Sequence, residues 1–116
     1  MAKIDDVRAI CEGLAGTTEE IKWGSDLCFC VAGKMYCVAV TEGPLRISLK
    51  VDPEEFEALC ERDGFLPAPY AARYKWVLIE YPEKVTIREL TTRIRKSYQL
   101  VTDKLPSKAR RALHLE

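Results

Sequence analysis

The sequence predicts an α+β domain built on a single antiparallel five-stranded sheet, with helices at its start, middle and end. Short apolar or alternating segments are separated by turns that contain glycine or proline, which is typical of strands joined as hairpins. Three other segments repeat apolar residues every three or four positions, as one face of a helix does. The length of 116 residues fits one ordinary domain, and 47% hydrophobic with 31% charged residues is a globular composition.

The first half of the chain predicts one helix followed by three strands. Residues 4–15 carry apolar side chains at helical spacing. Strands are expected at 27–31 and 34–40, joined by the two-residue turn Ala32-Gly33. The third strand, at 45–51, alternates apolar and polar residues as a half-buried strand does.

The second half predicts a helix, two strands and a long final helix. The middle helix, 53–64, begins with a proline and two glutamates after a capping aspartate, which favours a helix start. A short edge strand is expected near 70–74 and a strand rich in β-formers at 76–81. The last helix begins at Thr86, and Pro106 ends it before a basic tail. The helices should then gather on one face of the sheet.

The chain as a whole indicates one cytoplasmic domain over residues 1–114, with 115–116 as a possible vector scar. No apolar run approaches the length of about 18 residues that a membrane span needs, so no membrane contact is expected. The five cysteines are odd in number and do not follow the spacing of a secreted disulfide framework, which favours reduced thiols.

Short motifs along most of the chain resemble the MmcQ/YjbR family of small bacterial proteins. They are Trp23-Gly24, Gly33-Lys34-Met35-Tyr36, Leu49-Lys50-Val51-Asp52-Pro53-Glu54, Pro67-Ala68-Pro69-Tyr70, Lys75-Trp76-Val77 and Ser97-Tyr98-Gln99-Leu100-Val101. The resemblance implies a CyaY-like, or secretion-chaperone-like, fold. It also implies a DNA-binding accessory role, because family members carry that label on the strength of a proposed double-wing shape. That label rests on fold analogy, and a fold does not determine a function.

Charge is unevenly distributed, although the net charge is zero. Residues 1–64 carry 13 acids and 7 bases, whereas residues 65–116 carry 5 acids and 11 bases. Such asymmetry can mark a nucleic-acid surface, and DNA is the first partner suggested, mainly because of the label that the family resemblance carries. The candidate contacts lie off the apolar stripe of the last helix and beyond it: Arg88, Arg93, Arg95, Lys96, Lys104 and Lys108. The alternatives are a solvated helix face and two halves that neutralise each other.

Three cysteines of the first hairpin offer a second hypothesis. The two-residue turn places Cys28 opposite Cys37, so that these two and Cys30 share one face. Three thiolates could begin a soft-metal site, but no fourth ligand is supplied. A reduced, small-residue apolar surface is favoured, and no metal or cofactor is predicted.

Both faces of this hairpin are apolar, whereas the next strand has a polar side. Leu27, Phe29 and Val31 mark one hairpin face, and the cysteines mark the other. The polar side of the third strand consists of Arg46, Ser48 and Lys50. The second face should therefore present an apolar patch beside a polar strip, covered by a second copy of the chain, a protein partner or a ligand. The alternative is a helix of the same chain that reaches round the sheet edge.

Lys34 and Lys50 resemble family positions, and with Tyr70 and Lys75 they could line a small polar surface, which would suit a small-ligand binder as an alternative to a DNA-binding protein. Trp23 and Trp76 could stack on bases, although tryptophans in half-apolar segments more often lie in a core. The single histidine, His114, lies close to the C-terminus, a poor place to hold a base rigidly. No catalytic constellation is found, so the sequence predicts a protein that is not an enzyme.

Overall fold

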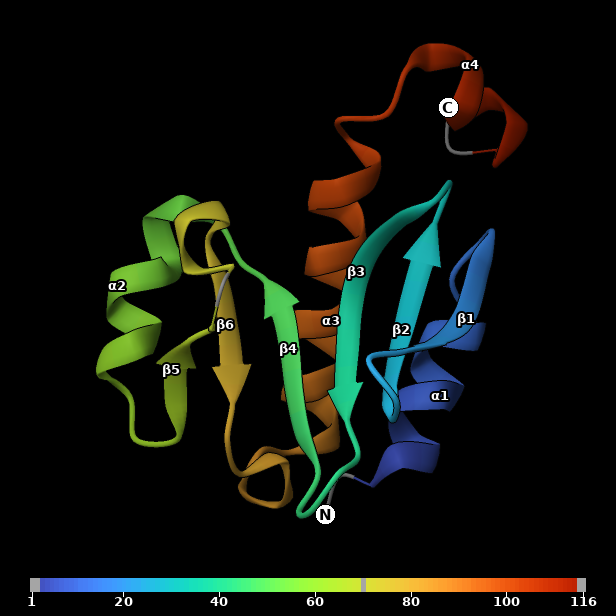
Figure 1. The fold of residues 1–116 in the computed structure, drawn as a ribbon. Helices are drawn as coiled ribbons and strands as arrows, with labels where there is room; N and C mark the ends of the chain where they lie inside the picture. Colours follow the sequence, from blue (N-terminus) through green and yellow to red (C-terminus); the bar gives the residue numbers. More distant parts are fainter. Residues whose placement is uncertain (1–2, 70, 115–116) are drawn as a thin grey trace.

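The computed structural model describes residues 3–69 and 71–114, and in them a six-stranded antiparallel sheet is backed by helices (Figure 1). The elements are α1 (Ile4–Glu12), β1 (Thr17–Lys22), β2 (Asp26–Val31), β3 (Lys34–Val40), β4 (Arg46–Lys50), α2 (Pro53–Glu61), β5 (Phe65–Pro67), β6 (Trp76–Ile79), α3 (Ile87–Thr102) and α4 (Ser107–Ala112). The strand order is β1-β2-β3-β4-β6-β5. Within these described ranges, no helix is both long enough and apolar enough to span a membrane.

The predicted α+β class is confirmed, but the predicted count of five strands is wrong. The additional strand is β1, which pairs with β2 along the sheet edge. Its sequence, Thr17-Thr18-Glu19-Glu20-Ile21-Lys22, has no apolar alternation, because most of its side chains are exposed. An edge strand that buries neither face leaves no periodic signal in the sequence.

The predicted edge strand near residues 70–74 is also wrong. Tyr70 lies outside the described residues, and Ala72–Tyr74 forms a short 3₁₀ turn. The edge strand β5 occurs earlier, at Phe65–Pro67, where it pairs with β6. The segment after Pro106 is likewise not a plain tail, since it forms the short helix α4.

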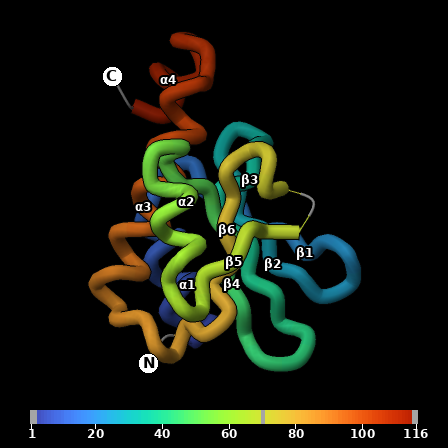
Figure 2. Tube along the Cα trace, turned by 90° about the vertical axis from the view of Figure 1, so that its left-hand side faces the viewer, coloured from blue at the N-terminus to red at the C-terminus, as the bar shows by residue number. Residues whose placement is uncertain are grey.

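The three longer helices α1, α2 and α3 lie on one side of the sheet and leave the other side open (Figure 2). The main core forms between them and the sheet, with Val7 of α1, Leu59 of α2 and Ile94 of α3 buried. Helix α3 begins at Thr86, whose hydroxyl accepts a hydrogen bond from the amide of Glu89 at 3.0 Å.

A β-bulge in β3 decides which hairpin side chains face this core. The turn Ala32-Gly33 is confirmed, since Val31 pairs with Lys34. Beyond it, Cys30 pairs with Met35 but Phe29 pairs with Cys37, so Tyr36 is an extra residue with no partner in β2.

The predicted pairing of Cys28 with Cys37 is therefore wrong, because every residue of β3 after the bulge changes face. Cys28 pairs with Val38. Cys37 and Ala39 turn into the helix-covered core, and Val38 and Val40 turn to the open face with Cys28. The three cysteines expected on one face are thus divided between the two sides of the sheet.

The extra residue Tyr36 is fully buried and connects three elements. Its hydroxyl lies 2.7 Å from Thr17 Oγ1 and donates a long hydrogen bond of 3.5 Å to the carbonyl oxygen of Cys11. Its ring meets Tyr98 of α3 edge to face, with centroids 5.2 Å apart. Burial raises the pKa of the Tyr36 hydroxyl, which keeps it neutral.

Beside the bulge, β3 and β4 separate and a serine of α3 bridges them. The strands pair from Val40 and Arg46 up to Cys37 and Leu49. The buried Ser97 hydroxyl then donates to the carbonyl of Tyr36 at 2.5 Å and accepts from the amide of Lys50 at 2.9 Å. One side chain thus satisfies two backbone groups at the place where the ladder ends.

We expect Ser97→Ala to lower the free energy of unfolding by about 2–3 kcal/mol, because it leaves a buried carbonyl and a part-buried amide without partners. Urea denaturation measures this change. Thr92→Ala is the control, since it removes an exposed hydroxyl of the same helix that bonds only to the carbonyl of Arg88. An equal and small effect of both substitutions would contradict the role given to Ser97.

Candidate binding groove on the open sheet face

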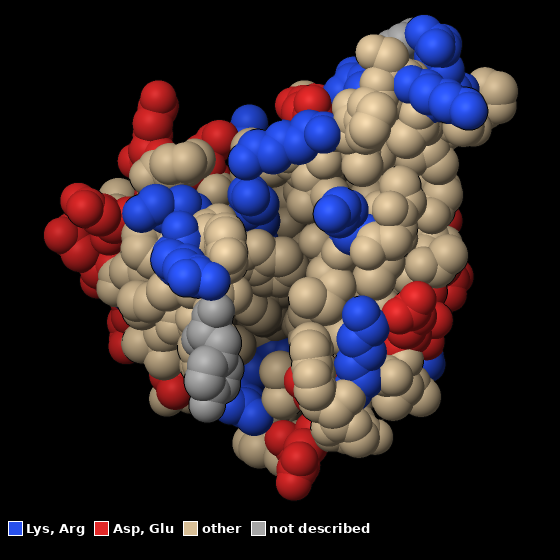
Figure 3. Space-filling model, turned by 45° about the horizontal axis from the view of Figure 1, so that its top comes forward, with Lys and Arg blue, Asp and Glu red and all other residues tan. Residues whose placement is uncertain are grey.

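The open face of the sheet carries a groove of about 1050 Å³. It runs over β3, β4 and β6, and the end of α3 reaches it where β3 and β4 separate. The space-filling view shows this hollow with Lys and Arg side chains around it and most Asp and Glu side chains toward the edges (Figure 3). Small-molecule sites have volumes of about 300–1,000 Å³, so the groove is large enough for such a ligand.

The floor of the groove is apolar. Val38, Met35 and Trp76 line it, and they pack against Cys28 and Cys30, which are buried and do not line the groove. The cross-strand neighbours Val38, Ser48 and Leu78 continue the floor from β3 through β4 to β6. An apolar body laid on this floor would remove apolar surface from water.

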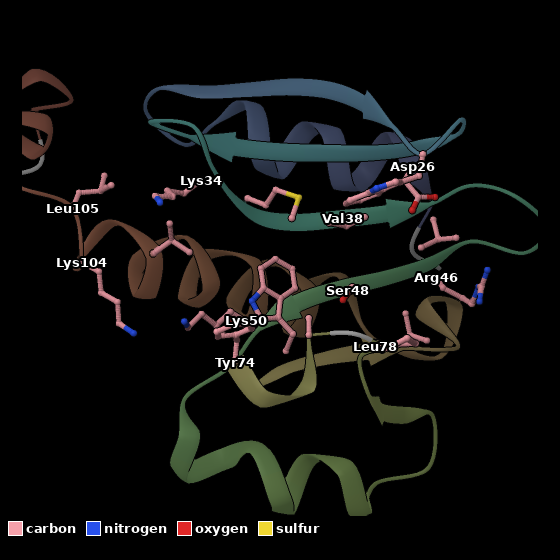
Figure 4. A pocket seen from close by; sticks show the side chains of 17 residues that line it. Asp26, Lys34, Val38, Arg46, Ser48, Lys50, Tyr74, Leu78, Lys104 and Leu105 are labelled. Atoms are coloured by element: carbon pink, nitrogen blue, oxygen red, sulfur yellow. The ribbon is translucent and has the colours of Figure 1, made fainter.

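Three lysines gather at one end of the groove: Lys34, Lys50 and Lys104 (Figure 4). They come from the start of β3, the end of β4 and the turn that follows α3. Asp26 and Arg46 lie at the opposite end (Figure 4). The groove is therefore polarised along its length, with positive charge concentrated where β3 and β4 separate.

The three ammonium groups have no acidic counterpart among the residues that the structure describes. Within residues 3–69 and 71–114, none of them forms a salt bridge, although seven such bridges occur elsewhere. The pKa of Lys50 is lowered, first by burial and then by the positive charge of Lys104. Two like charges held beside each other favour the approach of an anion.

Exposed aromatic side chains border the groove. Trp23, in the turn between β1 and β2, is 69% exposed, and Tyr74 is 53% exposed. The backbone of Trp23 has φ of 52°, a left-handed conformation that is rare for a bulky residue and carries strain of about 1–3 kcal/mol. Both rings offer flat surfaces to a bound ligand.

The small polar site expected from the sequence is brought together only in part. Lys34 and Lys50 both line the groove. Lys75 does not, because its ammonium lies 5.0 Å from the ring centroid of Phe56 in α2. Tyr70 is outside the described residues.

The six basic residues predicted to contact nucleic acid do not form one surface. Arg93 pairs with Glu55 at 3.6 Å and with Glu89 at 3.5 Å, and Lys96 pairs with Asp52 at 3.2 Å. These two bases are thus engaged in linking α3 to α2. The remaining four are exposed and lie apart: Lys104 lines the groove, Arg88 and Arg95 lie on α3, and Lys108 lies on α4.

The three cysteines of the first hairpin are buried and divided between the two faces of the sheet. Burial raises the pKa of Cys28 to about 11 and also raises that of Cys30, so both remain neutral thiols near pH 7. Cys37 faces the opposite side of the sheet. No three His, Cys, Asp or Glu side chains of residues 3–69 and 71–114 are grouped as a metal site.

Several lining residues were missed by sequence reasoning. Tyr74 and Leu78 line the groove together with Asp26. Lys50 and Trp76 are directly opposed on β4 and β6, and directly opposed residues share a face of the sheet. Knowing this pair would have identified the lining residues of β6. The pairing could not be predicted from local sequence, because β5 lies between β4 and β6 in the chain.

Comparisons with known proteins agree with this architecture. A family model described as YjbR matches residues 12–100. The crystal structure of the Deinococcus radiodurans protein DR2400, which carries a DUF419 domain, is 32% identical with a TM-score of 0.88, covering 100% of this chain and 91% of that one. A Pseudomonas syringae protein of known structure is 19% identical with a TM-score of 0.70, covering 86% of this chain and 98% of that one, which supports the fold alone. Among curated proteins, none matches the chain significantly.

We expect Lys104→Gln to raise the pKa of Lys50 toward that of an ordinary lysine, because the substitution removes the neighbouring positive charge and leaves the burial. An NMR titration of the Lys50 side chain measures this shift. Lys108→Gln removes an equal charge from α4, outside the groove lining, and should leave the pKa of Lys50 unchanged. A Lys50 pKa that does not respond to Lys104→Gln would contradict the proximity of the two ammonium groups.

Proposed function

The chain belongs to the YjbR family, and from the geometry of its groove we propose that it is a binding protein, without catalytic activity, for a ligand with an anionic group and a flat apolar body. One observation carries this proposal: three lysines that form no salt bridge with any described residue stand at one end of an apolar groove. The ligand would place its anionic group at the lysines and its body along the floor.

The apolar floor and the charged end of the groove make different contributions to ligand binding. Burying apolar area contributes roughly 25 cal/mol per Å², so an aromatic body on Val38 and Leu78 supplies affinity. The lysines orient the ligand, because its anionic group is attracted to their end of the groove and repelled by the carboxylate of Asp26 at the other end. A half-buried indole, that of Trp76, offers a surface for stacking.

The absence of catalysis is part of the proposal and follows from the chemistry of the lining. The described residues that line the groove include Asp26 but no histidine, cysteine or glutamate. The lining also holds the hydroxyls of Ser48 and Tyr74, but Asp26 and the lysines lie at opposite ends, so these charged groups do not form an acid–base pair with each other.

DNA binding, as an accessory protein, is the second candidate, and one observation favours it. Basic side chains continue from the hollow toward α4, where Lys108 and Arg111 are exposed (Figure 3). Single-stranded DNA whose bases stack on the exposed aromatic rings would suit such a surface. The pairing of Arg93 and Lys96 with acidic residues weakens the case for a contact through α3. A second copy of the chain, or another protein, on the open face remains a prediction, as does the CyaY-like fold that the family resemblance implies.

We expect one molecule of 8-anilinonaphthalene-1-sulfonate, an anion with a flat apolar body, to bind per folded chain. Ser48→Glu puts a carboxylate in the middle of the floor and should weaken this binding at least about tenfold, or about 1.4 kcal/mol. Fluorescence titration measures the affinity, and circular dichroism verifies the fold.

Thr18→Glu is the matched control for this substitution. Thr18 is exposed on the edge strand β1 and lies outside the groove lining, so affinity should change less than about twofold. Equal affinity of both variants would place the bound probe elsewhere and overturn the proposal.

A further inference from the structure

We propose that the anionic group held at the lysine end of the groove is a phosphomonoester dianion and not a carboxylate. This inference rests on the proposed function, since it assumes that the groove binds an anionic ligand. It assigns the chemistry of the group that Lys34, Lys50 and Lys104 would hold.

The kind of cation is the first argument. The planar guanidinium of arginine pairs with carboxylates and phosphates alike through two parallel hydrogen bonds, whereas lysine commonly binds phosphate as a point charge. The basic end of this groove is built of lysines, and the arginine that lines the groove, Arg46, lies at the other end. Ammonium groups are compact point charges, which can surround a tetrahedral group with several oxygens.

The amount of charge is the second argument. A phosphomonoester carries a charge of about −1.5 to −2 at pH 7, and three of its oxygens accept hydrogen bonds. Three lysines that have no salt bridge in the described ranges balance a dianion better than a carboxylate with a single charge. The lowered pKa of Lys50 agrees with this, because a dianion would offset the repulsion from Lys104.

The rigidity of the support is the third argument. The Lys50 amide is held by the Ser97 hydroxyl, and Val101, one helical turn further along α3, lines the groove. Lys104 follows in a turn that is closed by its own amide, which bonds to the Val101 carbonyl at 3.2 Å. The backbone of both lysines is therefore positioned by the same helix before any ligand arrives.

The test compares two ligands with the same body, 1-naphthyl phosphate and 1-naphthoate, at pH 7.5. We expect the phosphate to bind at least about tenfold more tightly, because the second charge interacts with the lysines. Tryptophan fluorescence and calorimetry on the intact chain measure both affinities. The double substitution Lys50→Gln with Lys104→Gln should bring the ratio of the two affinities, phosphate over carboxylate, close to one. Lys34→Gln alone should reduce this ratio in part.

Arg46→Gln is the matched control, since it removes one positive charge from the other end of the groove and should preserve the ratio. Equal affinity of the wild-type chain for both ligands would overturn this inference and leave the proposed function intact. Failure of both compounds to bind would contradict the proposed function itself.

A phosphomonoester can belong to a small molecule or to the end of a nucleic acid, and competition distinguishes these two sources. A thymidine tetranucleotide with a 5′-phosphate that displaces 1-naphthyl phosphate, where the 5′-hydroxyl form does not, would support a nucleic-acid end. Lack of displacement by both oligonucleotides, with tight binding of 1-naphthyl phosphate, would support a small phosphate ester. Equal displacement by both forms would show that internal phosphodiesters suffice and would overturn the inference.

Discussion

The hydroxyl of Ser97 is the contact on which the open face depends. It occupies the place where a β3–β4 backbone hydrogen bond would otherwise continue, and it satisfies the Tyr36 carbonyl and the Lys50 amide together. Because the two strands separate there, the last turn of α3 reaches the groove from behind the sheet. Without that opening, Val101 and Lys104 would be confined to the helix side, and the lysine end would lose one of its three cations.

The bulge at Tyr36 complements this opening. By adding one residue to β3, it turns Cys37 into the core and Val38 to the open face. The tyrosine itself is held between α1, β1 and α3, so the change of face is anchored from three directions. The same device therefore completes the main core and supplies the apolar floor of the groove.

Sequence reasoning succeeded where a local signal existed and failed where the chain depends on distant contacts. The turn Ala32-Gly33 and the helix start at Thr86 were predictable from residue type alone. The strand β1 was missed because it is polar and exposed at the sheet edge. The pairing of Cys28 with Cys37 was wrong because a bulge has no signature in a run of apolar residues such as Tyr36-Cys37-Val38.

The candidate site shows the same division. Lys34 and Lys50 could be named from family motifs, and the polar side of the third strand pointed to the open face. That Lys104 lies at the same end of the groove as these two lysines could not be predicted. This arrangement requires β3 and β4 to separate and Ser97 to bridge the two strands. Likewise, Arg93 and Lys96 appeared as free cations in the sequence, and only the packing of α3 beside α2 reveals their acidic partners.

Ligand binding is assigned to the open sheet face and not to the basic surface of α3. Two-dimensional NMR of the ¹⁵N-labelled chain during titration with 1-naphthyl phosphate tests this assignment most directly. We expect the largest chemical-shift changes at the amides of Met35 and Ser48 and at the indole N–H of Trp76, all from residues that line the groove. Changes concentrated at Arg88 and Arg95 on the exposed face of α3, with the groove signals unmoved, would contradict it.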